Sequence, residues 1–368
     1  MKVGNFFKAK IELVSGRIDS GLLKKRRSWL IGLSILVFII LISLVLMLLT
    51  PNNILIEHRG DVKITPTDQI KSGERLLDGV KVKPGQENLR SFAVVIENHS
   101  DARPQSGLDQ ASLVFEVVAE GGITRLLAFF DPSVKLSEIG PVRSARTYFL
   151  DWVSEIRPVF VHYGGETLTI TLIPKYDILD INGMYLSGQY FWRANYRPAP
   201  HNTYTSIDKL VKAWGQFGWQ ETEQFTPWEF KDEVKSANSP SSRDIKFNFS
   251  NSYIYNTSWS YDSADNSYLR SQAGDKHIDR ISGQQYKAKN VVAQITRIGI
   301  RDKEGHMGVE TIGGGKALIF QDGLVTQGFW RKNSREERTF FYDNNWQPIK
   351  FNRGLTWVEV VEEGAVSY

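Results

Sequence analysis

The hydrophobic pattern of the chain begins with one long apolar run. Residues 29–49 read WLIGLSILVFIILISLVLMLL and hold no charged side chain. A helix of this length, at about 1.5 Å per residue, covers the roughly 30 Å apolar core of a bilayer. A cleaved secretory signal is the alternative, but its apolar region is shorter and ends in small residues spaced for cleavage, which LLTPNN lacks. We therefore predict an uncleaved transmembrane helix over residues 29–50.

Short apolar runs separated by turn residues dominate the next part of the chain. They are FAVVIEN (92–98), SLVFEVV (112–118), RLLAFFD (125–131) and PVFVHY (158–163). Runs that are rich in β-branched and aromatic residues and bounded by Gly, Pro, Asn or Asp indicate strands. Glu120, Gly121 and Gly122 are expected to form the turn between the second strand and the third.

Two amphipathic stripes accompany these strands. Apolar residues recur at helical spacing from Val142 to Ile156, and Pro141 suits the first turn of such a helix. A second stripe covers residues 206–217, where Thr205 can act as the N-cap. Residues 85–232 are therefore predicted to form a mixed α/β domain.

Turn and linker residues mark the other boundaries. Residues 51–84 contain many Pro, Gly and Asn with little periodicity, which is typical of a stalk. Residues 233–244 form a polar linker, and residues 245–364 alternate short β-type runs with Asp, Asn and Gly turns. A β-rich second domain, a meander or a small barrel, is expected there. The predicted fold class is α+β: one N-terminal transmembrane helix, a mixed α/β ectodomain and a β-rich C-terminal domain.

The net charge of +4 is unevenly distributed. Residues 1–28 carry eight Lys or Arg and two acidic residues, so this tail has a net charge of +6 and the rest of the chain −2. A basic cluster directly before an apolar run places the N-terminus in the cytoplasm and residues 51–368 outside. The rest of the chain lacks the basic excess of nucleic-acid-binding proteins, so no nucleic-acid partner is expected. The absence of cysteine excludes disulfides, thiol nucleophiles and thiolate metal ligands.

An arginine pair stands at the start of the first predicted helix. In the segment EIGPVRSAR, Arg143 and Arg146 fall in the first two turns, where the helix macrodipole disfavours cations. Such a placement calls for an anionic partner. One candidate is a protein carboxylate: Glu116, Glu120 or Asp131. The other is a bound phosphate, sulfate or carboxylate ligand, and an exposed pair without a role is the third reading.

Two histidines stand in positions that suit proton transfer. His162 ends a predicted strand before two glycines, and His201 follows a Pro-Ala-Pro segment before a predicted helix. Either could act as acid or base near neutral pH, although a lone histidine is more often structural. A metal site of His162, His201 and carboxylates matches no known ligand spacing, and the sequence holds no P-loop, dinucleotide or hydrolase motif. We therefore expect no metal and no cofactor.

Several ordered motifs resemble the YerB-like family of bacterial lipoproteins. They are IENH (96–99), ARPQSGL (102–108), EGGITR (120–125), GPVRSAR (140–146), HYGG (162–165) and PHNTYT (200–205), followed by AKNVV (288–292), GGGKA (313–317) and GLTW (354–357). The resemblance covers about residues 85–362 and implies an envelope protein of two family domains whose activity is unassigned. Members are typically anchored through a lipidated cysteine. This chain has none, so the helix at 29–50 is expected to attach it to the membrane.

These observations lead to the hypothesis of a membrane-anchored, extracytoplasmic envelope protein that recognises an anionic or glycan-containing cell-wall ligand, or an envelope enzyme. The ligand-binding candidates are Arg103, Glu116, Glu120, Arg125, Arg143, Arg146, His162, His201 and Asn202. One alternative is a hydrolase or transferase acting on cell-wall material, with His162 or His201 as acid or base and the arginines holding charge. Another is a non-catalytic scaffold. A binding protein is favoured over an enzyme.

Overall fold

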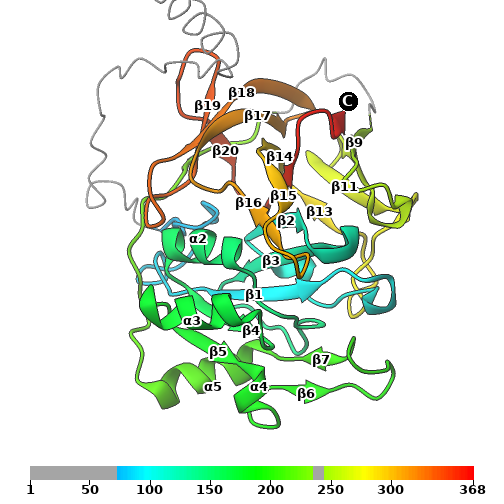
Figure 1. The fold of residues 1–368 in the computed structure, drawn as a ribbon. Coiled ribbons are helices and arrows are strands. Elements are labelled where there is room, and N and C mark those ends of the chain that lie inside the picture. The colour runs from blue at the N-terminus through cyan, green and yellow to red at the C-terminus, as the bar shows by residue number, and fades with distance from the viewer. Residues whose placement is uncertain (1–72, 235–243) are drawn as a thin grey trace, which may run out of the picture. The chain divides into compact units, whose positions relative to one another are not determined.

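A ten-stranded mixed sheet runs through the computed structural model and takes strands from both predicted halves of the chain (Figure 1). The structure describes residues 73–234 and 244–368. The predicted tail (1–28), the predicted transmembrane helix (29–50), residues 51–72 and linker residues 235–243 lie outside this part. Among the helices of the described residues, none combines the length and the hydropathy that a bilayer crossing requires.

The first half of the chain supplies five strands of this sheet. They are β1 (Phe92–Glu97), β2 (Leu113–Val118), β3 (Thr124–Phe130), β4 (Val159–His162) and β5 (Asp180–Asn182). Every residue of β1 to β4 is buried, as expected for strands that are covered on both faces. The four strands predicted from the apolar runs are confirmed, and β5 is an addition. The turn between β2 and β3 falls at the predicted glycines, with Gly121 at a φ of 67°.

Helices cover both faces of this half of the sheet. They are α2 (Thr147–Ile156), α3 (Thr167–Lys175), α4 (Gly183–Leu186) and α5 (Ile207–Phe217). Apolar side chains of α2 and α3 pack with Ala93 and Val95 of β1, whereas those of α5 pack with Phe92 and Val94. Successive side chains of a strand point to opposite faces. The α2–α3 pair and α5 therefore lie on opposite sides of the sheet.

The first helix begins later than predicted, and its two arginines do not lie within it. α2 starts at Thr147, and Arg146 occupies the N-cap position in an extended conformation (φ −134°, ψ 154°). The residues before it are extended too, because the backbone N–H of Arg143 donates to β1 at 2.8 Å. Val142 and Ala145 are buried, as the predicted helical stripe required. They belong, however, to an extended segment that runs along the sheet. The arginines therefore precede the helix.

The second predicted helix is confirmed, with a different cap. Ser206, rather than Thr205, is the N-cap of α5, and its side chain accepts a hydrogen bond from Lys209 N. A serine hydroxyl in this position satisfies one of the unpaired N–H groups of the first turn. Val211 and Phe217, which belong to the predicted stripe, are exposed.

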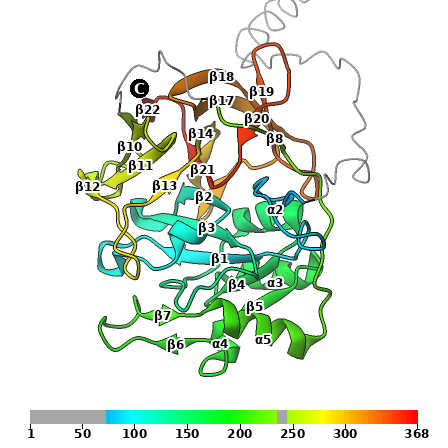
Figure 2. The same cartoon turned by 180° about the vertical axis from the view of Figure 1, so that it is seen from behind.

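The second half of the chain extends the same sheet. Its strands are β14 (Asn290–Ile295), β17 (Gly313–Gln321), β18 (Leu324–Lys332), β19 (Phe340–Asp343) and β21 (Thr356–Val361). The strand order is β19-β18-β17-β14-β21-β2-β3-β1-β4-β5, and β21 pairs in parallel with both β2 and β14 (Figure 2). The β-rich composition of this half is confirmed, but the expected meander or small barrel is wrong. β21 is buried along its whole length, so it takes an interior place in a larger sheet.

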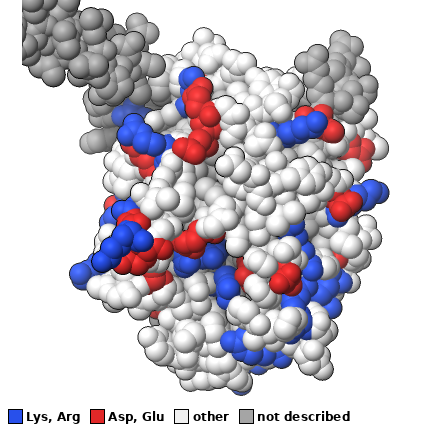
Figure 3. Space-filling model, turned by 45° about the vertical axis from the view of Figure 1, so that its right-hand side comes forward, with Lys and Arg blue, Asp and Glu red and all other residues white. Residues whose placement is uncertain are grey.

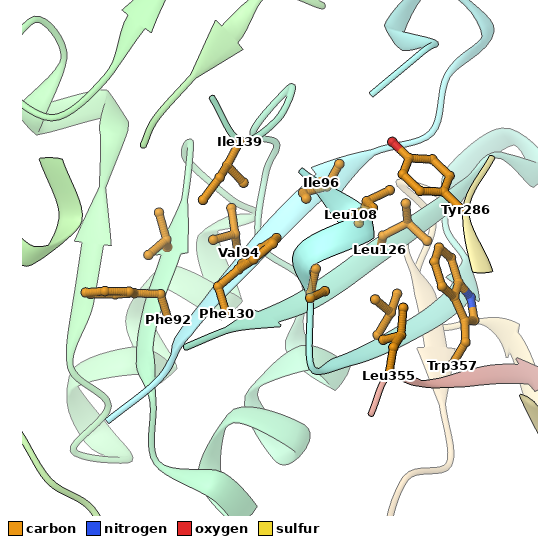
Figure 4. Packing of buried hydrophobic residues seen from close by; sticks show 14 of the residues in the cluster. Phe92, Val94, Ile96, Leu108, Leu126, Phe130, Ile139, Tyr286, Leu355 and Trp357 are labelled. Atoms are coloured by element: carbon orange, nitrogen blue, oxygen red, sulfur yellow. The ribbon is translucent and has the colours of Figure 1, made fainter. Parts of the chain in front are cut away.

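Smaller sheets flank the main one. The second sheet has the order β12 (Asp275–Lys276), β11 (Ser267–Gln272), β10 (Thr257–Asp262), β9 (Ile245–Phe247) and β22 (Val366–Ser367), and β13 (Lys287–Ala288) pairs with β11. The two-stranded pairs are β15 (Ile298–Ile300) with β16 (Met307–Val309), β20 (Lys350–Asn352) with β8 (Glu229–Lys231), and β6 (Trp192–Arg193) with β7 (Thr203–Tyr204). Tyr286 and Trp357 pack in one cluster with Leu126 and Ile96 (Figure 4). The apolar core is therefore continuous between the two halves.

Residues 73–84 pack against the fold, in contrast to the predicted stalk. Leu76 and Leu77 are each 6% exposed. Arg75 forms ion pairs with Asp78 at 2.6 Å and Asp131 at 3.2 Å, and Gly354 N donates to the backbone oxygen of Asp78 at 2.9 Å. The described part of the predicted stalk thus belongs to the folded unit.

Candidate functional site

The carboxyl ends of four strands meet at one edge of the ten-stranded sheet. β1 is parallel to β4, and β4 is parallel to β5, while β1 and β2 are both antiparallel to β3. These four strands therefore run in one direction. In open α/β sheets, ligands bind outside the carboxyl ends of the strands. The edge carries Glu97 at the end of β1, Glu120 after β2 and Arg125 near the start of β3.

Glu120 is the carboxylate that partners Arg146. Arg146 Nε and Nη2 donate to the two carboxylate oxygens, each at 2.6 Å, which makes the pair bidentate. Burial alone would raise the pKa of Glu120, but the hydrogen bond and charge of Arg146 hold this pKa below its usual value. Of the anionic partners weighed from the sequence, Glu120 is therefore the one that the fold brings to Arg146.

Arg125 stands beside this pair without a strong partner of its own. Its Nη2 is 3.8 Å from a Glu120 oxygen, and its Nη1 donates to the backbone oxygen of Ser144 at 3.1 Å. Burial, followed by the positive charge of Arg146, lowers the pKa of Arg125 to about 10. A guanidinium held in this way gains from an additional anion.

Glu97 holds a second arginine and one of the predicted histidines. His201 Nδ1 and Arg143 Nε lie 3.0 and 3.1 Å from the same oxygen, Oε1, of Glu97. Glu97 is only 4% exposed, and its Oε2 has no hydrogen-bond partner among the described residues. A buried carboxylate oxygen without a partner costs free energy, so this carboxylate is incompletely compensated.

His201 meets two residues that the sequence did not point to. Its ring stacks on the ring of His99, with centroids 4.6 Å apart and an interplanar angle of 20°. Asp101, whose side chain is 62% exposed, places Oδ2 4.0 Å from His201 Nε2 and 3.7 Å from His99 Nδ1. His99 and Asp101 lie within or beside the IENH motif, but no local spacing links them to His201.

Arg103 lies beside this group, bound to the residue that follows Glu97. It donates to the side-chain oxygen of Asn98 at 3.2 Å and to the backbone oxygen of Asn98 at 2.9 Å, and its guanidinium lies 5.2 Å from the ring centroid of Tyr255. Burial, followed by the charge of Arg270, lowers the pKa of Arg103 to about 10. We call the following residues the edge cluster: Glu97, Glu120, Arg103, Arg125, Arg143, Arg146 and His201.

Glu116 lies in the interior instead of in this cluster. It is fully buried and pairs with Arg270 of β11, with Arg270 Nη2 2.5 Å from Glu116 Oε2. Arg270 also lies over the rings of Trp357 and Trp259, at 4.8 and 5.7 Å from their centroids. Glu116 is therefore not positioned to contact a ligand as predicted. An arginine inside an alternating strand such as SYLRSQ is the sequence signal that could have indicated its buried partner.

Glu359 adds a second carboxylate to this interior. It lies opposite Glu116 in the pairing of β2 with β21 and accepts a hydrogen bond from Trp259 Nε1 at 2.7 Å. Burial, followed by the charge of Glu116, raises the pKa of Glu359 well above its usual value. We call Glu116, Arg270, Glu359, Trp259 and Trp357 the buried centre.

Three other predicted residues serve the scaffold. His162 is fully buried, with Nδ1 2.7 Å from the backbone oxygen of Gly164 and Nε2 3.1 Å from Asp180 Oδ2. Asn202 Oδ1 accepts from Arg193 Nη1 at 2.8 Å, which fixes the loop before β7. Asp131, a predicted arginine partner, pairs with Arg75. His162 and His201 therefore do not form one site.

Two groups of side chains in the described residues could hold a metal ion. One is His99, Asp101 and His201, and the other is Glu166, Asp302 and His306. A separate cavity of about 430 Å³ lies beyond the carboxyl end of α2, lined among others by Arg157, Tyr176 and Trp219. This cavity includes no residue of the edge cluster.

Comparison with known proteins identifies the family. The N-terminal domain model of DUF3048, described as a protein of unknown function, matches residues 77–220, and the C-terminal domain model matches residues 245–358. The chain belongs to the DUF3048 family. Within this DUF3048 chain, the edge cluster lies in the N-terminal match, whereas Arg270 comes from the C-terminal match.

Relatives of this DUF3048 chain agree with the resemblance seen in the motifs. It is 33% identical over 299 residues to "Putative lipoprotein YerB" of Bacillus subtilis (strain 168), covering 80% of this chain and 88% of that one. The crystal structure of the YerB protein from Bacillus subtilis superposes with a TM-score of 0.73 at 31% identity, over 80% of this chain and 98% of that one. Membership of the YerB-like family is thus confirmed.

Proposed function

We propose that this chain binds an anionic or glycan-containing ligand of the bacterial envelope at the edge cluster. The observation that carries the proposal is the excess of guanidinium groups there. Arg125 and Arg146 stand beside Glu120, and Arg143 stands beside the buried Glu97. Arg103 is hydrogen-bonded to Asn98, the residue that follows Glu97. Among the described residues, neither Arg103 nor Arg125 donates a hydrogen bond to a carboxylate. Phosphate and carboxylate ligands are the natural complement of such a group.

Arg143 is the member of the cluster best placed to meet a ligand. Its side chain is 28% exposed, compared with 12% for Arg146, and its one close carboxylate is shared with His201. Figure 3 shows Lys and Arg side chains gathered over the lower right of one face, with acidic side chains between them. Local basic surface therefore exists although the chain after its N-terminal tail carries a slight negative charge.

We also propose that residues 29–50 anchor the chain in the membrane, with the N-terminus in the cytoplasm and the family domains outside. The apolar run, the basic residues before it and the absence of cysteine support this. Protease added to cells whose wall has been opened should digest residues 51–368 and spare the basic tail. Protection of the family domains would reverse the topology.

A catalytic role is the second candidate, because His201 and Glu97 form a histidine–carboxylate pair. The carboxylate can orient the imidazole, which suits general acid–base chemistry on cell-wall material. His162, the other predicted base, is fully buried and does not fit this role. The two candidates differ only in whether the ligand is turned over.

One incubation separates them. The full-length protein in detergent is mixed with purified peptidoglycan fragments, and both retention of the fragments and the masses of the products are measured. Retention without new masses supports binding, and new masses that disappear in His201→Gln support catalysis. Arg143→Gln should weaken retention at least about tenfold, as for the loss of a hydrogen bond to a charged group. Arg297→Gln is the matched control. The Arg297 side chain is 85% exposed, and it pairs with Glu310, which does not belong to the edge cluster. Equal retention by wild type and both variants would contradict the proposal.

A further inference from the structure

We propose that His99, Asp101 and His201 bind a divalent first-row transition ion of the Zn²⁺ class, with Glu97 orienting His201. The three residues come from the turn after β1 and the loop before β7. One ligand atom of each lies within 4.8 Å of the others. Two imidazoles and one carboxylate are a donor set that such ions accept while keeping positions open for water or an anion.

His201 is oriented for coordination by the carboxylate behind it. Its Nδ1 lies 3.0 Å from Glu97 Oε1, and because a carboxylate only accepts, the proton of the neutral ring sits on Nδ1. The lone pair of Nε2 is then free on the side of Asp101, whose Oδ2 is 4.0 Å away. Histidine ligands of metals are usually held by such a carboxylate, which fixes the ring and raises the basicity of the coordinating nitrogen.

The other two ligands reach the ion through a short approach of Asp101 and a rotation of the His99 ring. Ligand atoms around a tetrahedral Zn²⁺ lie about 3.3 Å apart, given bond lengths of roughly 2.0–2.1 Å. Asp101 Oδ2 is 3.7 Å from His99 Nδ1, so these atoms need to approach by a few tenths of an ångström. His99 Nδ1 accepts a hydrogen bond from Asp101 N at 3.2 Å, and coordination through this nitrogen replaces that bond. The His99 ring must also turn out of its stack on His201, since an ion lies in the plane of each imidazole that binds it. Its side chain is 30% exposed, which leaves room for this rotation.

The state of Glu97 is a second and independent indication. This carboxylate is buried, and its Oε2 has no partner among the described residues. Its Oε1 already serves both His201 and Arg143. A cation on His201 would polarise the Nδ1–H that Glu97 accepts and so offset part of the cost of the buried charge. A cation on His201 would therefore lower the cost of burying Glu97, through the oxygen Oε1 that His201 already contacts.

The second group of potential ligands has two carboxylates and one imidazole, and a protein cation already occupies it. Between Glu166 and Asp302, Arg301 Nη2 donates to Glu166 Oε2 at 2.5 Å and to Asp302 Oδ2 at 2.9 Å. The guanidinium already supplies the cation there, and His306 Nδ1 lies 2.9 Å from Asp302. Among the described residues, no Lys or Arg side chain forms a hydrogen bond or an ion pair with His99, Asp101 or His201. His306 is therefore the matched control for His201.

Ion binding is tested directly on the full-length, untagged chain in detergent. Calorimetric titration with Zn²⁺ at pH 7.5 should show saturable one-to-one binding, and Co²⁺ should give the visible absorption of a site with nitrogen ligands. Asp101→Asn and His201→Gln should each weaken Zn²⁺ binding at least about tenfold, and Glu97→Gln about 10–100-fold, as for other outer-shell partners. His306→Gln should bind Zn²⁺ like the wild type.

The outcomes that overturn the site are equally specific. They are the absence of saturable Zn²⁺ binding, binding that survives both Asp101→Asn and His201→Gln, or binding that only His306→Gln removes. Should His201→Gln lower the melting temperature in metal-free buffer, Asp101→Asn decides, because Asp101 is exposed and its loss leaves the core intact. These titrations contain no envelope ligand. Failure of the ion site is therefore distinguishable from failure of the proposed function.

Discussion

The buried centre and the edge cluster both contain arginine–glutamate pairs, but these pairs differ in their exposure to solvent. In the buried centre, Glu116 and Arg270 are both fully buried and 2.5 Å apart, and the guanidinium is enclosed by two tryptophan rings. In the edge cluster, Arg143 and Glu120 are 28% and 27% exposed, and one carboxylate oxygen of Glu97 serves both a guanidinium and an imidazole. In the buried centre, the charge of Arg270 is paired with that of Glu116. In the edge cluster, Arg125 donates no hydrogen bond to a carboxylate of the described residues, so its positive charge is available to a ligand.

This difference separates a structural role from a binding role. Arg270 lies on β11, and Glu116 lies on β2, so their pair ties together segments that match the two DUF3048 domain models. A pair without access to solvent can contribute only to folding. The edge cluster lies where strands end and loops converge, so its side chains can exchange one partner for another.

Arg270→Gln should cause the largest effect. The change leaves Glu116 buried without its cation, and removing one partner of a buried ion pair costs about 3–5 kcal/mol. The free energy of unfolding, measured by urea denaturation of the full-length chain in detergent, should fall by this amount. Arg297→Gln, an exposed arginine, should leave it unchanged. A loss below about 1 kcal/mol would show that the buried centre does not hold the halves together.

Arg146→Gln should cost less, about 2 kcal/mol, because its pair with Glu120 is bidentate but only partly buried. The pKa of Glu120 is lowered in the folded protein, so this contribution is present above the unfolded pKa of about 4.5 and is lost as pH falls through the folded pKa. Melting curves between pH 7 and pH 3 should show a shallower acid loss in the variant than in the wild type. Identical acid profiles would contradict the assignment of Glu120 as the partner.

The sequence was sufficient to predict elements whose pattern is decided locally. β1 to β4 read as apolar runs between turn residues, and α5 has an apolar stripe, although its cap is Ser206 and not the predicted Thr205. α3 escaped prediction because TLTITLIPK is rich in β-branched residues and contains Pro174, so propensity opposes the structure that tertiary packing imposes. The start of α2 was misplaced because Val142 and Ala145 fit a helical period while belonging to an extended segment.

The candidate site was predictable as a set of residue types and not as a set of contacts. An anionic partner for Arg146 was expected from the sequence, and Glu120 was one of the protein carboxylates considered, although the arginine precedes the helix in which it was placed. His201 contacts Glu97 and stacks on His99 because the loop before β7 reaches the end of β1. No local spacing encodes this arrangement. Likewise, no local spacing indicates that Glu116 pairs with Arg270, which lies far along the chain. Glu116 was therefore assigned to a ligand site although it is buried.

Glu359→Gln should stabilise the protein, in contrast to the two arginine variants. Burial and the charge of Glu116 raise the pKa of Glu359, so the folded state keeps a proton that the unfolded chain releases above pH about 4.5. Wild-type stability therefore falls by about 1.4 kcal/mol for each pH unit between the unfolded and folded pKa values. Glutamine removes this slope and can still donate toward Glu116. Urea denaturation at pH 5 and pH 8 should show a gain that grows with pH, and a gain independent of pH would contradict the protonated state of Glu359.

Arg143→Gln should have the smallest effect on stability and a clear effect on binding. The side chain is 28% exposed and shares Glu97 with His201, so its removal should change the free energy of unfolding by no more than about 1 kcal/mol. Retention of peptidoglycan fragments should nevertheless fall at least about tenfold, because an anionic group would lose a charged donor. Phosphate in millimolar amounts should raise the melting temperature of the wild type, through preferential binding to the folded state, and raise that of Arg143→Gln less. A large loss of stability in this variant would instead make Arg143 a structural residue like Arg270, and the contrast between the edge cluster and the buried centre would disappear.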